Sequence, residues 1–201
     1  SLDTLLHPTL DEKSTINVIA NGLPASPGAA SGKVVFTSEE AERLNSMMQD
    51  TILVRVETSP EDIQGMHAAK GILTARGGMT SHAAVVARGM GRPCVSGSSE
   101  IDINYEKKIF KTSSVEIKEG EIITIDGSTG RIISGRVATL KPEISGDFSK
   151  LMSWADNYRK LNIRTNSETP KDTKIAKDFG AEGIGLCRTE HMFFDEERIL
   201  S

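Results

Sequence analysis

Short apolar runs separated by polar turns alternate with helical patterns over the first half of the chain. The runs at 33–36, 51–56 and 71–75 predict buried strands, because each is short and rich in aliphatic residues. Helices are predicted to begin at Ser38 and at Ser59, where a capping residue precedes acidic side chains and, in the second case, a proline at the first helical position. This alternation is typical of βα units.

The pattern changes after a pair of glycines, Gly77 and Gly78, which ends the third apolar run. An alanine-rich helix is predicted next, with Thr80 or Ser81 as its cap. We therefore predict an α/β fold with a β-rich second half over about 22–140. The short β-type runs of that second half lie at 93–96, 108–110, 115–117, 122–125 and 131–133.

The last third of the chain predicts one amphipathic helix and one βαβ unit. A strand at 162–166, a helix that begins at Thr169 and a strand at 183–190 make up the unit. Because one helix cannot cover both faces of two parallel strands, we expect the chain to be a piece of a larger protein. The amphipathic helix is indicated by apolar side chains at helical spacing, namely Phe148, Leu151, Met152, Trp154, Ala155 and Tyr158.

Four segments result from these patterns. A connector precedes the α/β body, a linker helix follows it, and the tail is the truncated start of a parallel β/α domain. The body begins with a stretch rich in glycine and proline, which predicts tight, irregular backbone over 22–32. The predicted boundaries are 1–20 for the connector, 21–140 for the body, 141–160 for the linker helix and 161–201 for the tail.

Charge and composition narrow the classes of function. Lys and Arg number 24 and Asp and Glu 28, a net charge of −4, and no long basic block exists, so nucleic-acid binding is not expected. No apolar run approaches about twenty residues, and residues 1–10 lack the basic flank of a leader, so neither a membrane span nor a signal peptide is expected. Cys94 and Cys187, both expected in the core, form no CxxC pair, which favours a reducing cytosol. The four scattered histidines offer no metal-ligand spacing, so no metal site is predicted.

The segment from Gly77 to His82 carries the strongest chemical signal. Its glycines lead into a helix N-terminus, where unpaired N–H groups stabilise an anion and the backbone can approach it closely. Thr80 and Ser81 add hydroxyl donors, and His82 can act as a nucleophile through one ring nitrogen while the other donates a hydrogen bond. Together these residues suit a phosphohistidine site. From the residues alone, the simpler interpretation is a capped helix with a surface histidine.

The segment 77–97 resembles, without a gap, the phosphohistidine signature of the pyruvate phosphate dikinase family, a group of phosphoenolpyruvate (PEP)-utilising enzymes. Segment 22–32 resembles the start of that family's central domain, and segment 186–194 resembles the early part of its PEP-binding barrel. PEP synthases and enzyme I of the sugar phosphotransferase system share a Gly-Gly-x-Thr-x-His core. They typically lack the Cys-Val-Ser-Gly ending found here at 94–97, so the resemblance favours the dikinases.

This resemblance implies a swivelling phosphohistidine domain of β/β/α type, followed by a linker helix and an incomplete start of a TIM barrel. It implies that His82 accepts a phosphoryl group derived from ATP and passes it to pyruvate, so that ATP, phosphate and pyruvate become AMP, pyrophosphate and PEP, reversibly. Arg188 would bind the phosphoryl group of PEP, which suits an arginine fork. Thr80 matches a threonine that a regulatory kinase modifies in plant members. The residues implied to stabilise the phosphoryl group on His82 are Gly77, Gly78, Thr80 and Ser81.

The resemblance also implies partners outside this chain. They are an ATP-grasp domain, the complete PEP- and pyruvate-binding barrel, and a second copy of the parent, since the family is usually dimeric. Mg²⁺ would serve the parent's phosphates, with no ligand from this chain. The expected location is cytoplasmic, or organellar as in some members, and neither nucleic acid nor membrane is an expected partner. Two alternatives stay open, the same domain of a PEP synthase and a non-catalytic adaptor with the same fold.

Overall fold

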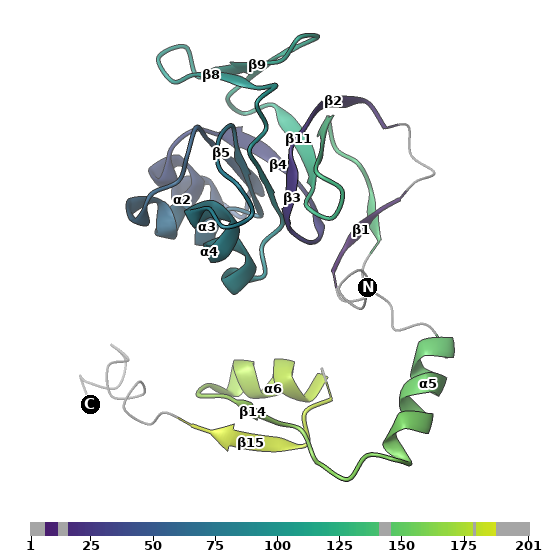
Figure 1. The fold of residues 1–201 in the computed structure, drawn as a ribbon. Helices are drawn as coiled ribbons and strands as arrows, with labels where there is room; N and C mark the ends of the chain where they lie inside the picture. Colours follow the sequence, from purple (N-terminus) through teal and green to yellow (C-terminus); the bar gives the residue numbers. More distant parts are fainter. Residues whose placement is uncertain (1–6, 12–15, 141–145, 179, 188–201) are drawn as a thin grey trace, which may run out of the picture. The chain divides into compact units, whose positions relative to one another are not determined.

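The computed structural model describes residues 7–11, 16–140, 146–178 and 180–187 (Figure 1). The chain divides into two compact units, Ser1–Glu143 and Ile144–Ser201. The predicted end of the α/β body, at 140, lies close to this division.

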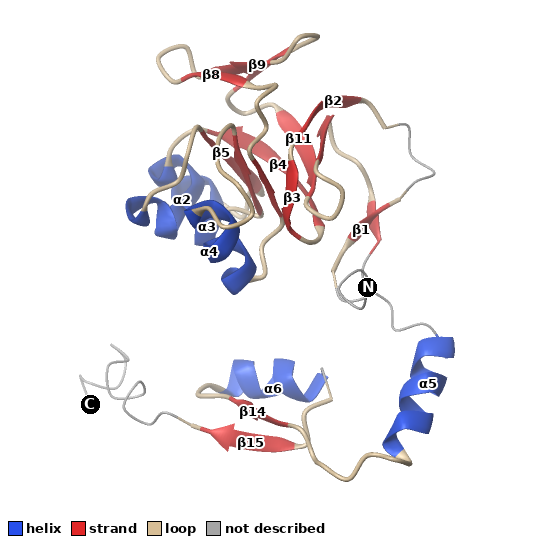
Figure 2. Cartoon of the chain, in the orientation of Figure 1, coloured by secondary structure: helices blue, strands red, loops and turns tan. Residues whose placement is uncertain are grey.

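An eight-stranded mixed sheet is the framework of the larger unit (Figure 2). Its strand order is β2-β12-β11-β4-β5-β6-β7-β3. Neighbours from β4 to β7 are parallel, and the other pairs in the sheet are antiparallel. The strands are β2 (Val18–Asn21), β3 (Leu23–Ser26), β4 (Ala29–Val35), β5 (Thr51–Arg55), β6 (Gly71–Thr74), β7 (Cys94–Ser96), β11 (Ile122–Asp126) and β12 (Arg131–Ser134).

The two faces of this sheet carry separate cores, because successive side chains of a strand point to opposite faces. Leu53 and Ile72 belong to a core shared with three helices on one face. Ile52 and Leu73 belong to the other core, which includes Phe110 from a small three-stranded sheet. This layering confirms the predicted β/β/α architecture. The helices are α2 (Ser38–Ser46), α3 (Ile63–Ala68) and α4 (His82–Met90), and the small sheet contains β8 (Asp102–Asn104), β9 (Ile109–Lys111) and β10 (Glu116–Lys118).

The segments that precede and follow the main sheet pair with each other. β1 (Thr9–Leu10) and β13 (Thr139–Leu140) form a two-stranded antiparallel sheet. The backbone N–H of Ala29, at the start of β4, donates to the carbonyl of Pro8 (2.8 Å). The first and last described strands of the larger unit therefore lie together, beside the beginning of β4.

The small residues at 22–32, predicted to form irregular backbone, instead form strands. β3 lies within this segment, and β4 begins at Ala29, well before the predicted strand at 33–36. A Cβ atom at Gly32 would lie 2.7 Å from the carbonyl carbon of Thr51, so β4 needs a glycine where it lies against β5. Apolar periodicity misses such a strand, because close backbone packing sets its composition.

The first helix begins at Ser38 itself, the predicted cap, and so one residue earlier than predicted. Thr37 is the N-cap, since its Oγ1 accepts from the backbone N–H of Glu40 (3.2 Å). Ser38 is buried instead, and its hydroxyl donates to Oδ1 of Asp62 (3.0 Å) in the 3₁₀ turn η1 (Pro60–Asp62) that precedes α3. The serine thus joins α2 to the start of the next helix.

The smaller unit contains the predicted helix and the predicted βαβ arrangement. Within the described residues no closed barrel forms, since the sheet of this unit has two strands. Cys187 is exposed, so its expected core position is wrong; the neighbouring Ile184 and Leu186 of β15 are also exposed. Trp154 is also half-exposed on its helix. The elements are α5 (Gly146–Asp156), β14 (Arg164–Asn166), α6 (Pro170–Asp178) and β15 (Gly183–Leu186), with β14 and β15 parallel.

Candidate functional site

The candidate site lies at the N-terminus of α4, where His82 is the first helical residue. Ser81 is the N-cap, and its Oγ accepts from the backbone N–H of Ala84 (3.3 Å). This leaves Thr80 outside the helix, with an exposed side chain. The free N–H groups of the first turn and the positive end of the helix dipole therefore lie at the end of the helix that carries His82.

Glycines shape the loop that leads to this helix. Gly77 has a φ of +111°, and a Cβ atom there would lie 2.9 Å from Cβ of Ser81. Gly97 has a φ of +63°, and a Cβ atom there would lie 2.3 Å from the carbonyl oxygen of Gly77. Gly78 differs, because a Cβ atom on it would meet no atom within 4 Å. The loop is thus closely packed at Gly77, against Ser81 and Gly97, and open at Gly78.

Ser96, at the end of β7, supports the loop from the sheet. Its Oγ lies 3.3 Å from Oγ of Ser81 and donates to the carbonyl of Gly78 (3.4 Å). The hydroxyl of Thr74, at the end of β6, donates to the carbonyl of Arg76 (2.8 Å). Two neighbouring strand ends therefore fix the loop before His82.

A second loop holds the imidazole ring itself. Oγ1 of Thr58, which follows β5, lies 3.0 Å from Nδ1 of His82. Among the described residues Nε2 has no hydrogen-bond partner, and the ring is half-buried. When Nδ1 carries the proton and donates it to Thr58, the lone pair lies on Nε2, the nitrogen that is free to react.

Sequence reasoning missed Thr58. It lies next to Ser59, which was noticed only as the start of a helix. The available signal was topological, since β5 and β6 are parallel neighbours and their C-terminal ends meet at one edge of the sheet. The loops that follow these C-terminal strand ends approach each other. Ligands in open α/β sheets bind at the C-terminal ends of the strands.

Arg88 is also closer to the site than its sequence position suggests. The sequence favours a solvated arginine on another part of the helix. The side chain is exposed, but its Nη2 donates to the carbonyl of Met79 (2.6 Å) and its Nε donates to the carbonyl of Ala84 (3.2 Å). The guanidinium therefore folds back along α4 and holds the loop that precedes His82.

The structure brings together the predicted residues of the helix N-terminus. Gly77, Gly78, Thr80 and Ser81 all lie in the loop immediately before His82. Arg188 lies outside the described residues.

Cys94 is a buried neighbour of the site and not a second nucleophile. It lies in the core between β7 and the helices, and burial raises the pKa of its thiol to about 12. Arg88 opposes this shift only in part. A thiol with such a pKa is almost entirely protonated near neutral pH, so its reactivity is low.

Neither a metal cluster nor a membrane helix occurs in the part of the chain that the structure describes. No group of three or more His, Cys, Asp or Glu side chains among those residues could hold a metal ion. None of the described helices has the length and apolar character needed to cross a bilayer.

Family comparisons match both units. The mobile domain of PEP-utilising enzymes matches residues 47–130, which include Thr58 and His82. The PEP-binding domain of PEP-utilising enzymes matches residues 142–201.

Curated relatives match the chain over nearly all of its length. It is 59% identical to a pyruvate, phosphate dikinase of Rhizobium meliloti over 99% of this chain, 58% identical to one of Clostridium symbiosum over 100%, and 57% identical to pyruvate, phosphate dikinase 2 of Zea mays over 98%. The chain spans 22–23% of the length of these relatives. A solved NMR structure of an Enzyme I protein aligns with 58% of this chain and 40% of its own, at 21% identity and a TM-score of 0.32, which supports no argument. By its two matched domains and its similarity to these dikinases, the chain belongs to the family of PEP-utilising enzymes.

Proposed function

We propose that this chain is the phosphoryl-carrying part of a pyruvate phosphate dikinase, with His82 as the carrier. The parent would convert ATP, phosphate and pyruvate to AMP, pyrophosphate and PEP, in either direction. The observation that carries the proposal is the state of the His82 ring, whose Nδ1 is held by Thr58 while Nε2 is open at a helix N-terminus. The similarity of the whole chain to dikinases supports this function over that of a PEP synthase.

In the proposed transfer His82 reacts as a neutral imidazole. Its Nδ1–H donates to Oγ1 of Thr58, and the lone pair of Nε2 forms the N–P bond. For AMP to be released, Nε2 attacks the β-phosphorus of ATP, and the P–O bond to AMP breaks with its electron pair leaving on the AMP oxygen. Inorganic phosphate then takes the terminal phosphoryl group as pyrophosphate, and one phosphoryl group stays on Nε2. In the last transfer the enolate oxygen of pyruvate attacks phosphorus, and the electrons of the N–P bond return to Nε2. The proton on Nδ1 stays in place in every step, so Thr58 can orient the ring throughout.

The start of α4 would stabilise the phosphoryl group on Nε2. Its free N–H groups and dipole are worth about 0.3–1 kcal/mol to a nearby anion, and more where the anion is partly buried. Gly78 has open space beside it, which would admit the phosphoryl oxygens, and the Thr80 hydroxyl is exposed nearby. The N-cap Ser81 would keep the first turn in place.

Phosphorylation of the chain by phosphoramidate, a small phosphoryl donor, tests this proposal. We expect the intact mass to increase by one acid-labile, alkali-stable phosphoryl group in the wild type and not in His82→Asn. Equal gain in His82→Asn would refute the assignment of the carrier. An unreactive His82 in a folded chain would support the non-catalytic adaptor.

The role of Thr58 has its own test. Thr58→Val removes one hydrogen bond to the ring, worth about 1 kcal/mol, so phosphorylation of His82 should slow about fivefold. The ¹⁵N shifts of the ring should show a loss of the Nδ1–H tautomer, and Thr58→Ser should restore both properties. Unchanged ¹⁵N shifts in Thr58→Val would contradict the proposed orientation of the ring.

The remaining features of the parent are part of the same proposal. A swivelling motion would carry phospho-His82 between an ATP-grasp domain and a barrel in which Arg188 binds the phosphoryl group of PEP. The parent would be dimeric and would use Mg²⁺; among the described residues no group of three or more His, Cys, Asp or Glu side chains could hold a metal ion. Both thiols are free, which supports a reducing cytosol. Assay of the full-length parent separates the enzymes, because a dikinase consumes phosphate and releases pyrophosphate, whereas a synthase releases phosphate.

Regulation through Thr80 is also proposed here. Phosphate on this exposed residue would crowd the helix N-terminus and repel the phosphoryl donor. Thr80→Asp should then lose phosphorylation of His82 while Thr80→Val keeps it, and an active Thr80→Asp would count against this regulation.

A further inference from the structure

A cavity lies at the opposite end of the parallel strands of the main sheet from His82. The residues that line it precede strands: Asp50 comes before β5, Lys70 before β6 and Arg92 before β7. His82 and Thr58, in contrast, follow β6 and β5. Since β4 to β7 are parallel, the cavity and the phosphohistidine site lie at opposite ends of the same strands.

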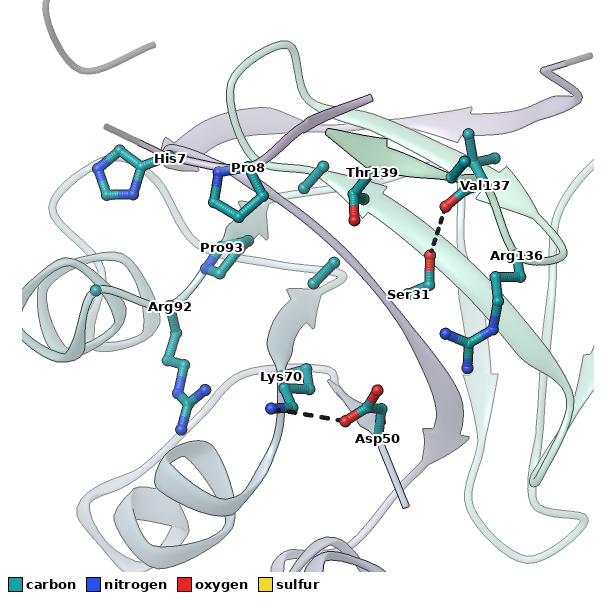
Figure 3. Close-up of a pocket in the computed structure, with 14 residues that line it drawn as sticks. His7, Pro8, Ser31, Asp50, Lys70, Arg92, Pro93, Arg136, Val137 and Thr139 are labelled. Carbon is teal, nitrogen blue, oxygen red and sulfur yellow. Dashed lines mark hydrogen bonds and ion pairs between the residues drawn. The ribbon is translucent and has the colours of Figure 1, made fainter. Parts of the chain in front are cut away.

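The charge of this cavity is unbalanced. Lys70, Arg92 and Arg136 line it together with one carboxylate, Asp50, so its net charge is about +2 when His7 is neutral. In the view of Figure 3, Lys70 and Asp50 lie between the two arginines. Cations that line one cavity repel each other, and an anion among them would relieve that repulsion.

The cations are only partly satisfied by the protein. Lys70 Nζ lies 3.6 Å from Oδ1 of Asp50, a long ion pair. Arg92 donates through Nη2 to the carbonyl of His67 (2.9 Å), which fixes the side chain without neutralising its charge. Arg136 has no hydrogen-bond or ion-pair partner among the described residues, although an arginine fork suits an oxyanion well.

The size and the other walls of the cavity favour an organic anion over a bare ion. Its volume is about 610 Å³, within the range of roughly 300–1,000 Å³ typical of small-molecule sites. Its lining also includes the apolar residues Pro8, Ala29, Ala30, Pro93 and Val137. We propose that this cavity binds a small organic phosphate, with its dianionic group near Arg136, Lys70 and Arg92 and its apolar part against the two prolines.

Such a ligand would act on the first and last described strands of the larger unit. His7 and Pro8 flank β1, and Thr139 belongs to β13, which pairs with β1. A ligand that contacts both segments stabilises their pairing by mass action. The backbone N–H of Asp11, which donates to the carbonyl of Ala138 (2.9 Å), reports on this pairing by hydrogen exchange.

Titration of the ¹⁵N-labelled chain with phenyl phosphate, followed by amide chemical shifts, tests the proposal. Inorganic phosphate is the control that carries only the charged group, and phenol is the control that carries only the apolar ring. We expect saturable shifts at Ala29, Arg92 and Arg136 with phenyl phosphate, weaker binding of inorganic phosphate and none of phenol. At a concentration ten times the Kd, hydrogen exchange at the Asp11 amide should slow about tenfold.

The variants separate this site from the phosphohistidine site. Arg136→Gln, an exposed position whose fold the same spectra monitor, should weaken phenyl phosphate about tenfold. Lys118→Gln, an exposed cation on β10, and His82→Asn should leave binding unchanged. Non-saturable shifts, equal affinity in Arg136→Gln, or shifts confined to residues 78–82 would overturn the proposal. None of these measurements requires phosphorylation of His82. Their outcome is therefore independent of whether His82 is the phosphoryl carrier.

Discussion

Tyr105 reaches from the small sheet to the loop that holds the His82 ring, and loss of its hydroxyl group should lower the rate at which His82 is phosphorylated. The residue lies in the turn between β8 and β9, and its hydroxyl accepts from the backbone N–H of Val56 (2.8 Å). Two residues later, Thr58 contacts Nδ1 of His82. Tyr105→Phe removes the acceptor and nothing else from this chain of contacts.

The other end of the same loop is anchored independently. The buried carboxylate of Asp62 accepts from the backbone N–H of Ser59 (2.9 Å) and lies 3.4 Å from Nε of Arg55. Thr58 therefore lies between two anchors, Tyr105 on one side and Asp62 on the other. Loss of one anchor should loosen the loop without unfolding it.

The size of the effect can be worked from these contacts. The aromatic ring of Tyr105 packs edge-on to Phe36, with centroids 6.3 Å apart, and Arg55 lies 5.4 Å from its centroid. Phenylalanine keeps both contacts, so the expected loss is one hydrogen bond, about 1 kcal/mol of unfolding free energy. For a unit of this size the melting temperature should fall by about 3 °C.

Calorimetry and phosphorylation by phosphoramidate measure the two consequences. The rate of phosphorylation of His82 in Tyr105→Phe should lie between those of the wild type and Thr58→Val. The matched control is Tyr158→Phe, which changes the other tyrosine of the chain, an exposed residue of the smaller unit. A normal rate in a Tyr105→Phe protein that melts 3 °C lower would show that the anchor serves stability alone, and the positioning argument would fail.

Three further predictions concern packing and reactivity. Gly65→Ala should destabilise the larger unit by about 1–3 kcal/mol in calorimetry despite its better helix propensity, because the new Cβ atom would lie 2.5 Å from Cα of Ser38. An aromatic disulfide reagent at pH 8 should modify Cys187 and not Cys94, whose pKa is raised to about 12 by burial, whereas both thiols should react in denaturant. Asp126→Ala should cost about 2–3 kcal/mol by calorimetry, since the buried carboxylate accepts three hydrogen bonds from its turn and an adjacent arginine.

The sequence predicts most clearly the elements whose apolar side chains are buried. The strands at 51–55 and 71–74 and the helix after Ser81 lie close to where apolar runs and capping residues place them. β3 and the first half of β4 could not be found in this way, because their glycines and alanines reflect backbone packing. β8 was also missed, since its alternation of polar residues has only Ile103 to mark a buried face.

The candidate site likewise has one part that the sequence predicts and one part that it does not. Its first half, the loop and helix that end in His82, is contiguous in the chain, so glycines and a cap reveal it. Its second half, Thr58 with the anchors Tyr105 and Asp62, is assembled by contacts between distant segments. Nothing local distinguishes Thr58 from any other threonine before a helix, and only the parallel pairing of β5 and β6 brings it to the ring.

The arrangement of the larger unit also bears on the proposed swivelling motion. The His82 ring follows β6, whereas β1 and β13 lie beside the start of β4, where the carbonyl of Pro8 accepts from the N–H of Ala29. The β1–β13 pair and the proposed carrier are therefore at opposite ends of the parallel strands of one sheet. A rotation about the β1–β13 pair would produce its largest displacement at the other end of the strands, so in the proposed motion a small change at this pair would move a phosphoryl group on His82 farthest. The proposed phosphate cavity lies at that pivot, which is why its ligand should affect the motion of the carrier without touching its chemistry.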